Sequence, residues 1–256
     1  NLEISHLKSN EKLLKKDANK SFPVIIGKSR AMQEIMNLID KIAVTDASVL
    51  ITGENGTGKE LIAREIHNRS DRKNELFVLV DLTSLAESLF ESELFGHKKG
   101  SFTNAYEDKT GRFTMADKGT LFLDEIGNLS FHLQAKLLSA IENRQITRIG
   151  SNQSIPADIR LICATNRNLE KLVGEGLFRE DLLYRINTIQ IELPPLRERG
   201  DDILLLARHF LAHGARQDQV ARPAEVLDQI DEAVSHATAT SDVKPINVDG
   251  QSVVSV

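Results

Sequence analysis

Apolar residues along the chain follow two spacings, which predict helices and strands in turn. Between residues 30 and 42, Met32, Ile35, Met36, Ile39 and Ile42 recur at helical spacing, and Ser29 stands where a helix cap belongs. Further helical patterns occupy residues 59–69, 84–94, 130–143 and 201–213. Short apolar runs between them predict strands at 48–52, 76–81, 120–124, 158–164 and 188–193. Strands that alternate with helices predict an α/β fold with a parallel sheet covered on both faces.

The two ends of the chain lack this alternation. Residues 1–22 are polar and rich in lysine, and Leu7 and Leu14 are one heptad apart, which fits either a solvated linker or a short coiled-coil connector. Toward the C-terminus, Pro223 is placed to open an amphipathic helix, and residues 238–256 are expected to be poorly ordered. We therefore expect a linker at 1–22, a folded core at 23–213, and an atypical helical or disordered tail at 214–256.

The composition excludes several classes of protein. The 256 residues are 41% hydrophobic and 27% charged, an ordinary globular balance, and the net charge of -5 gives no electrostatic case for binding nucleic acid. No apolar stretch approaches the roughly 20 residues needed to cross a bilayer. The single cysteine, Cys163, excludes an internal disulfide and lies in an apolar run, so we expect a buried strand thiol in a cytoplasmic protein. Because the chain starts at Asn1 without methionine, we expect an excised fragment.

A glycine-rich segment between the first predicted β-strand and the following helix has the spacing G-x-x-x-x-G-K. It consists of Gly53, Glu54, Asn55, Gly56, Thr57, Gly58 and Lys59. Glycines let successive backbone N–H groups point at phosphate oxygens, the helix N-terminus adds partial positive charge, and the lysine reaches the β- and γ-phosphates. The segment therefore predicts an ATP-binding loop. Glu60 follows where a Ser or Thr hydroxyl usually binds Mg²⁺, so the metal must depend more on other groups.

Polar residues end two of the later apolar strands. The run 121–125 ends in Asp124 and Glu125, and buried strands rarely end in carboxylates without a reason. We expect Asp124 to hold Mg²⁺, directly or through water, and Glu125 to polarise the water that attacks ATP. The run 159–164 ends in Thr165 and Asn166, at the end of a parallel sheet where ligands bind, which suggests groups that sense the γ-phosphate or orient the water.

These motifs occur in an order that resembles the central AAA+ domain of bacterial enhancer-binding proteins, which are sigma-54-dependent transcription activators. The matching blocks are 53–60, 93–97, 119–125, 164–166, 178–185 and 193–199, and the resemblance covers about residues 23–213. It implies a P-loop AAA+ fold of three layers, α-β-α, with a five-stranded parallel sheet. It also implies a ring of identical subunits, a hexamer or heptamer, that binds ATP and Mg²⁺ between neighbours.

The resemblance also assigns roles to residues outside the phosphate loop. Arg179 and Arg185 match the arginine fingers, which act on the ATP of the next subunit. Members of the family use a loop reading Gly-Ala-Phe-Thr-Gly-Ala to contact sigma-54 RNA polymerase and promoter DNA. Here residues 100–105 keep Phe102 and Thr103 as the contact pair, but Ser101 and Asn104 replace Ala and Gly.

Two further departures separate this chain from the family pattern. Asp81 stands where the family places an Asn that restrains the catalytic glutamate, which predicts altered coupling between partner binding and hydrolysis. The family's Trp-Pro-Gly-Asn-x-Arg-Glu-Leu motif is missing, so the C-terminal helical lid is expected to be truncated or atypical. No helix-turn-helix is recognisable, so upstream DNA binding would need another module.

The resemblance therefore implies an ATP-hydrolysing motor that remodels the sigma-54 RNA polymerase closed complex. Two alternatives remain open: a nucleotide-binding regulatory module that assembles without engaging sigma-54, and a ring ATPase with another target. The motor and the ring ATPase would both show cooperative hydrolysis. Only the motor would bind sigma-54 in the presence of a transition-state analogue of ATP.

Overall fold

The computed structural model describes residues 25–83, 87–103, 105–217, 247–248 and 251–252. They belong to two compact units: unit 1 holds Ile25 and Ala31–Pro195, and unit 2 holds Ile26–Arg30 and the residues from Leu196 onward. The patterns predicted around Leu7, Leu14 and Pro223 lie outside the described residues, as does Asn104. The expected segment boundaries at residues 22 and 213 stay predictions.

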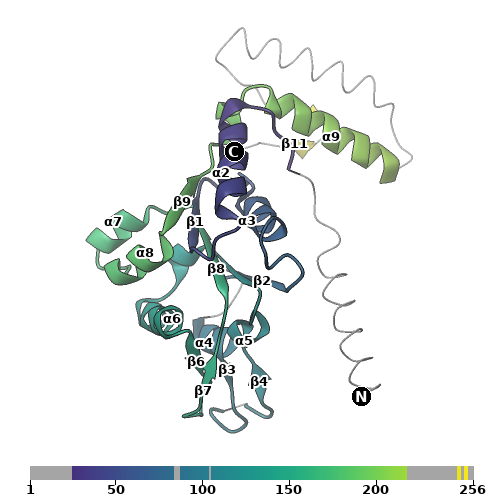
Figure 1. Ribbon diagram of the computed structural model, residues 1–256. Coiled ribbons are helices and arrows are strands. Elements are labelled where there is room, and N and C mark those ends of the chain that lie inside the picture. Colours follow the sequence, from purple (N-terminus) through teal and green to yellow (C-terminus); the bar gives the residue numbers. More distant parts are fainter. Residues whose placement is uncertain (1–24, 84–86, 104, 218–246, 249–250, 253–256) are drawn as a thin grey trace. The chain divides into compact units, whose positions relative to one another are not determined.

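Unit 1 is built on a five-stranded parallel sheet (Figure 1). The strands are β1 (Val49–Thr52), β2 (Phe77–Asp81), β5 (Thr120–Asp124), β8 (Arg160–Thr165) and β9 (Ile189–Glu192). Their order is β2-β5-β8-β1-β9, so the first strand lies inside the sheet, between β8 and β9. The predicted α/β fold with five parallel strands is confirmed, and each strand lies within two residues of its predicted range.

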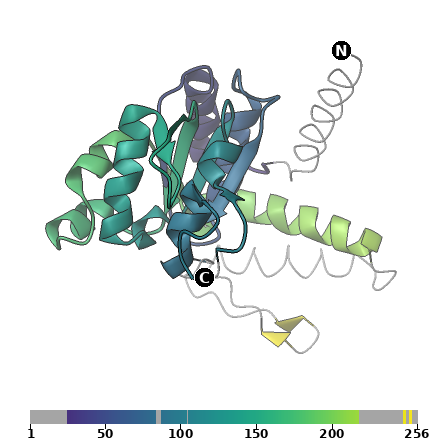
Figure 2. The same cartoon turned by 90° about the horizontal axis from the view of Figure 1, so that it is seen from below.

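Helices cover both faces of this sheet, which gives three layers. They are α2 (Arg30–Ile42), α3 (Lys59–Asn68), α4 (Glu87–Phe95), α5 (Arg112–Met115), α6 (Phe131–Asn143), α7 (Leu169–Gly174) and α8 (Glu180–Ile186), with a 3-10 turn η1 (Ile126–Asn128). Figure 1 shows α2 and α3 on one side of the sheet and α6 to α8 on the other, and Figure 2 shows the strands between these helical layers. The three-layer α-β-α arrangement is that of the P-loop AAA+ fold.

Alternating side chains of the strands supply two hydrophobic cores, except that the edge strand β9 contributes to one of them only. In β1, Val49 and Ile51 pack with α2 and α3, whereas Leu50 belongs to the core formed with α4 to α8. In β8, Ile162 joins the first core and Cys163 the second. Because both faces of the inner strands β1, β5 and β8 are buried, these strands read as apolar runs. Cys163 is fully buried, as predicted, and its burial raises the pKa of the thiol.

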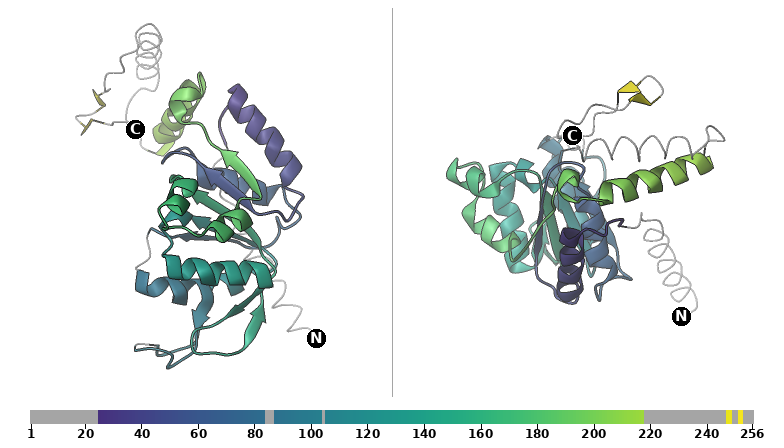
Figure 3. Two further views of the ribbon diagram at one scale, coloured as in Figure 1. Left: turned by 90° about the vertical axis from the view of Figure 1, so that its left-hand side faces the viewer. Right: turned by 90° about the horizontal axis from the view of Figure 1, so that it is seen from above.

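Two small hairpins lie beside each other next to α4, α5 and α6 (Figures 1 and 3). They are the pair β3 (Gly96–His97) and β4 (Lys109–Thr110), and the pair β6 (Gln145–Thr147) and β7 (Ser154–Pro156). Backbone hydrogen bonds join them: Lys98 N donates to Ile149 O (2.9 Å), and Ile149 N donates to Gly96 O (3.0 Å). The loop 98–108 that contains Phe102 therefore rests on the second hairpin.

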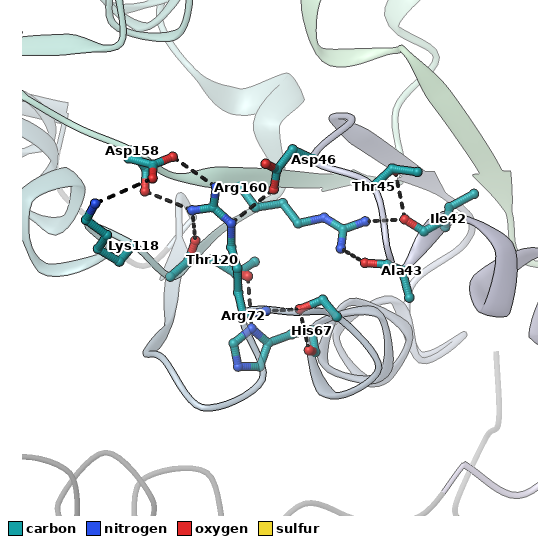
Figure 4. Close-up of polar contacts among 12 residues, drawn as sticks. Ile42, Ala43, Thr45, Asp46, His67, Arg72, Lys118, Thr120, Asp158 and Arg160 are labelled. Atoms are coloured by element: carbon teal, nitrogen blue, oxygen red, sulfur yellow. Dashed lines mark hydrogen bonds and ion pairs between the residues drawn. The ribbon is translucent and has the colours of Figure 1, made fainter.

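The amino end of the sheet, where the strands begin, carries a buried polar network (Figure 4). Arg160, at the start of β8, donates to Ala43 O (2.5 Å) and Ile42 O (2.8 Å) at the end of α2. At the start of β5, Thr120 Oγ1 lies 2.9 Å from His67 Nδ1. These bonds tie α2 and α3 to the strands they cover.

Unit 2 contains the 3-10 turn η2 (Leu196–Glu198), helix α9 (Asp202–Gln217) and the short antiparallel pair β10 (Asn247–Val248) and β11 (Gln251–Ser252). The buried carboxylate of Asp202 accepts hydrogen bonds from Lys28 N (2.6 Å), Ser29 N (3.0 Å) and Ser29 Oγ (2.6 Å). The Ser29 hydroxyl, expected to cap α2, thus donates to α9 of the same unit. In the part of the chain that the structure describes, no helix is long and apolar enough to cross a membrane.

Candidate active site

The predicted phosphate loop joins β1 to α3 at the carboxyl end of the sheet, where the strands end. Gly58 precedes α3 with a φ of 94°, in the left-handed region that favours glycine. A Cβ on Gly53 would lie only 2.9 Å from Leu193 O, so the loop passes too close to β9 for a side chain. Thr57 Oγ1 donates to Glu54 O (2.8 Å) and closes the turn. Glycine is therefore favoured at Gly58 by its positive φ and at Gly53 by the close approach of another backbone segment.

Lys59, the first residue of α3, lies under this loop and is only 7% exposed. Its Nζ donates to Gly53 O (3.2 Å) and Glu54 O (3.3 Å) and lies 3.4 Å from Glu125 Oε1. An ammonium group held by carbonyls and one carboxylate is poised to exchange those partners for phosphate oxygens. Glu60 does not join this cluster, because its Oε1 accepts from Arg64 Nε (2.8 Å) one turn along α3.

Three carboxylates gather at the ends of β2 and β5. Asp81 and Asp124 are partners in the strand register, and Glu125 follows Asp124 directly. Burial, and then the negative charge of Glu125, raise the pKa of Asp124, and Asp81 adds to the effect. Asp81 Oδ1 also accepts from Thr83 N (2.8 Å) and Thr83 Oγ1 (2.7 Å). The sheet therefore concentrates negative charge beside the phosphate loop.

Glu125 has a left-handed backbone, with φ 56° and ψ 47°. Such conformations are uncommon for residues other than glycine and cluster at functional sites. Glu125 Oε1 faces Lys59, and Glu125 Oε2 accepts from Asn166 N (3.2 Å). The strained turn holds the carboxylate between the phosphate loop and the end of β8.

The pair at the end of β8 divides between two environments. Asn166 Nδ2 donates to Asn55 Oδ1 (2.8 Å), so Asn166 bridges Glu125 and the phosphate loop. Thr165 is fully buried, and its Oγ1 accepts from Arg167 N (3.1 Å). Asn166 is therefore the member of the pair that the structure places against the candidate nucleotide site.

The donor set at this end of the sheet suits Mg²⁺, which prefers oxygen ligands and usually binds one or two carboxylates together with phosphate oxygens and water. Asp124 is half-buried beside Asp81, and both present hard oxygen atoms. Among the described residues no group of three or more His, Cys, Asp or Glu side chains forms a self-sufficient metal cage. The residues present therefore fit a cation that is bound jointly with a nucleotide.

The two candidate arginine fingers lie around α8. Arg179 precedes the helix, and its guanidinium pairs with Asp181 through Nε–Oδ1 (3.0 Å) and Nη2–Oδ2 (2.6 Å). Arg185, in the last turn, is exposed and has no hydrogen bond or ion pair within the described residues. Neither guanidinium has a hydrogen bond or ion pair with the phosphate loop among those residues, and their role as fingers stays a prediction.

The predicted partner loop is folded back on itself. Gly100 N donates to Ala105 O (2.8 Å), and Lys98 Nζ pairs with Asp108 Oδ2 (2.6 Å). Phe102 is 39% exposed, and its ring meets that of His97 edge-on at 4.9 Å. Thr103 is exposed next to it. Both residues of the predicted contact pair are thus exposed to solvent, and their contact with a partner stays a prediction.

Sequence reasoning missed Gln134, a fully buried residue of α6 that holds the start of α8. Its Oε1 accepts from Arg179 N (2.8 Å), and its Nε2 donates to Leu129 O (2.8 Å) and Leu177 O (3.0 Å). The available signal was a polar residue on the apolar face of the predicted helix 130–143. Buried amides are normally fully hydrogen-bonded, and this one is.

Comparison with known proteins agrees with this geometry. Residues 25–192 match the model of the Sigma-54 interaction domain family. The chain is 50% identical over 222 residues to the Nif-specific regulatory protein of Azospirillum brasilense, covering 87% of this chain and 35% of that protein. It is 51% identical over 217 residues to the regulatory protein AtoC of Escherichia coli K12, covering 85% of this chain and 46% of that protein.

Among solved structures, NtrX from Brucella abortus in complex with ATP superposes with a TM-score of 0.74 at 32% identity, covering 86% of this chain and 48% of that one. The chain thus spans about a third to a half of the relatives it matches. With a family match that extends over the whole parallel sheet, the chain belongs to the Sigma-54 interaction domain family.

Proposed function

We propose that this chain is an ATP-hydrolysing motor domain that remodels the sigma-54 RNA polymerase closed complex and so activates transcription. The observation that carries the proposal is the convergence of Lys59, Glu125 and Asn166 at the carboxyl end of the sheet, beside the phosphate loop. The family membership and the ATP complex of the similar NtrX protein support the same reading.

The proposed chemistry assigns one task to each group. Backbone N–H groups of residues 53–58 and the Lys59 ammonium bind the phosphates and neutralise charge that develops during hydrolysis. Glu125 accepts a proton from the attacking water, and Asn166 orients it. Asp124 would hold Mg²⁺, which supplies further charge neutralisation at the phosphates when bound. Arg179 and Arg185 complete the site from the next subunit of a ring.

The proposed partner surface is the loop tip with Phe102 and Thr103. An exposed aromatic ring supported by a buried histidine is suited to inserting into a protein or nucleic-acid surface. When ATP bound between two subunits reaches the transition state for hydrolysis, this loop would move against sigma-54.

One observation favours a second candidate, a nucleotide-binding module that assembles without opening promoters. Asp81 lies in register with Asp124, so an extra carboxylate stands at the catalytic end of the sheet. Repulsion between carboxylates at this position would disturb the control of Glu125 and uncouple hydrolysis from partner binding.

The deciding measurement is the ATPase rate per subunit as a function of protein concentration. A cooperative rise is expected, because each site needs arginines from a neighbour, and Arg179→Ala or Arg185→Ala should lower turnover by ~10³ while ATP binding persists. Binding of sigma-54 in the presence of a transition-state analogue of ATP then separates the motor from the second candidate. A rate that stays at zero at every concentration contradicts the proposed hydrolysis.

A further inference from the structure

The backbone of Arg179 is fixed from inside the protein. Arg179 N donates to Gln134 Oε1 at 2.8 Å, and Gln134 has no exposed surface. The amide of Gln134 also binds Leu129 O and Leu177 O, so its own orientation is determined on both sides. Arg179 therefore leaves the protein surface from an anchored point.

The side chain of Arg179 is then held at two further points. The carboxylate of Asp181 takes the Nε and Nη2 donors, at 3.0 and 2.6 Å, while the guanidinium carbon lies 5.7 Å from the centre of the Phe131 ring. Phe131, the first residue of α6, is 50% exposed, so its ring lies at the surface where the Arg179 guanidinium can reach it. Cation–π contact with Arg179 gives this exposed ring a role.

The pairing leaves one end of the guanidinium available. Arg179 Nη1 makes no hydrogen bond with the described residues, because Asp181 engages only the Nε and Nη2 side of the fork. Hydrogen bonding to Arg179 lowers the pKa of Asp181, so the pair stays charged at neutral pH. Asp181 is itself fixed, since its Oδ1 also accepts from Leu182 N at 2.7 Å.

We propose that Phe131 and Asp181 are positioning residues that aim the Nη1 end of Arg179 outward toward the nucleotide of a neighbouring subunit. This inference rests on the proposed function and names two residues that act through the arginine. Fixing a flexible side chain before the transition state removes an entropy cost from the chemical step. Because the binding of ATP depends on other groups, positioning of Arg179 should raise kcat and leave KM unchanged.

The alternative role for Asp181 is to sequester Arg179, and this role predicts a rise in turnover when the carboxylate is removed. If Asp181 sequestered Arg179 against its own subunit, removal of the carboxylate would release the guanidinium and raise turnover. The free Nη1 end argues for positioning, since a carboxylate that sequestered the fork would cover the donors that reach phosphate. The sign of the rate change therefore decides between the two roles.

The experiment measures kcat, KM and the thermal unfolding midpoint for the full chain and for Asp181→Asn and Phe131→Leu, at protein concentrations where the rate per subunit is constant. Each variant is expected to lower kcat by roughly 3- to 5-fold, with KM and the unfolding midpoint unchanged. Glu180→Gln is the matched control: it removes a carboxylate next to Asp181 that has no hydrogen bond or ion pair among the described residues, and it should leave kcat unchanged.

A double variant tests whether the two residues act through Arg179. In an Arg179→Ala background, Asp181→Asn should cause no further loss of the residual turnover. An equal additional loss, a rise in kcat, or an unchanged kcat in both single variants would each overturn the positioning role. A wild-type chain without turnover would contradict the proposed function and, with it, this inference, whereas unaffected variants of an active chain would overturn this inference alone.

Discussion

The two ends of the parallel sheet differ in how their charged side chains are paired. At the amino end, Arg72 forms ion pairs with Asp46 (3.0 Å) and Asp158 (2.9 Å), and Arg160 is buried against the carbonyls that end α2 (Figure 4). At the carboxyl end, carboxylates of like charge stand next to each other. The same strands connect both ends, since β5 begins with Thr120 and ends with Asp124.

This contrast separates stability from function. Paired charges and satisfied carbonyls at the amino end hold α2, α3 and the strands together. Glu125 and Asp81 both repel Asp124 at the carboxyl end, and Lys59 pairs with Glu125. A bound ligand with positive charge would relieve the repulsion between these carboxylates. The destabilisation that they cause in the ligand-free protein is therefore a consequence of the function of the site. Four changes test the contrast, from the largest expected effect to the smallest.

Removal of the candidate base should cost the most. Glu125→Gln keeps the size of the side chain but cannot accept a proton, so turnover is expected to fall by ~10³. The free energy of unfolding should change little, because the relief of repulsion with Asp124 offsets the lost ion pair with Lys59. Steady-state ATPase assays and urea denaturation check both parts. Glu142→Gln, on the exposed face of α6, is the control and should change neither quantity. Loss of stability together with turnover would show that the carboxyl end also maintains the fold.

Acid should weaken the protein through the amino end. Burial lowers the pKa of His67 from 6.5 to about 4. Between these two pH values His67 is protonated in the unfolded chain but stays neutral in the folded protein. The free energy of unfolding should therefore fall as the pH drops from 6.5 to 4, by about 3 kcal/mol from this residue. Urea denaturation at a series of pH values measures the slope.

The His67→Asn variant keeps a polar partner for Thr120 but cannot be protonated in this range. It should be less stable at pH 7, because it loses the edge-on contact with Phe77, and its stability should vary less with pH. The exposed His132 provides a matched control, and His132→Asn should keep the wild-type slope. An unchanged slope in His67→Asn would rule out this residue as the source.

Removal of the buried guanidinium should have a moderate effect. Arg160→Met deletes the donors to Ile42 O and Ala43 O and should lower the free energy of unfolding by about 2 kcal/mol. Ile42 O keeps its hydrogen bonds from Thr45 N and Thr45 Oγ1, so the cost comes from the buried Ala43 O, which loses its donor. The rate of ATP hydrolysis per folded molecule should not change. Lys171→Met, at an exposed position of α7, is the control. Equal stability of Arg160→Met and wild type would mean that desolvation of the charge cancels its hydrogen bonds.

Sequence alone predicted the elements whose signal is long or chemically specific. The inner strands β1, β5 and β8 are apolar runs because both faces are buried. The phosphate loop has fixed glycine spacing because Gly53, Gly56 and Gly58 all have a positive φ. Short elements were missed: β3, β4, β6 and β7 have two or three residues each, too few for a periodicity to appear. Helices α7 and α8 were missed for the same reason, with six and seven residues.

Contacts between distant elements were beyond the sequence. The proximity of Asp81 to Asp124 depends on β2 lying next to β5, and strand order does not follow from the pattern of one chain. The pairing of His67 with Thr120 and the hold of Gln134 on Arg179 likewise join residues 53 and 45 positions apart. The sequence identified candidate groups at the ends of strands, and the fold determined which of them meet.

The smallest expected change concerns Asp81 and sharpens the contrast at a single position. Asp81→Asn keeps the Oδ1 acceptor for Thr83 but removes one negative charge beside Asp124, so the free energy of unfolding should rise by roughly 0.5 kcal/mol at pH 7. The pKa of Asp124 is raised in part by Asp81, and the folded state loses stability as the pH rises through that pKa. In the variant this loss should be smaller and shifted to lower pH.

The same substitution tests control of hydrolysis. Without the Asp81 charge, Asp124 beside Glu125 experiences less repulsion, so basal and sigma-54-stimulated ATPase rates should change relative to each other. Thr83→Val is the matched control, because it disrupts the hydroxyl contact of Asp81 and leaves the carboxylate charge in place. If Asp81→Asn alters neither rate, the Asp81 carboxylate affects stability but not hydrolysis. The groups that control hydrolysis at the carboxyl end of the sheet would then come from β5, β8 and the phosphate loop alone.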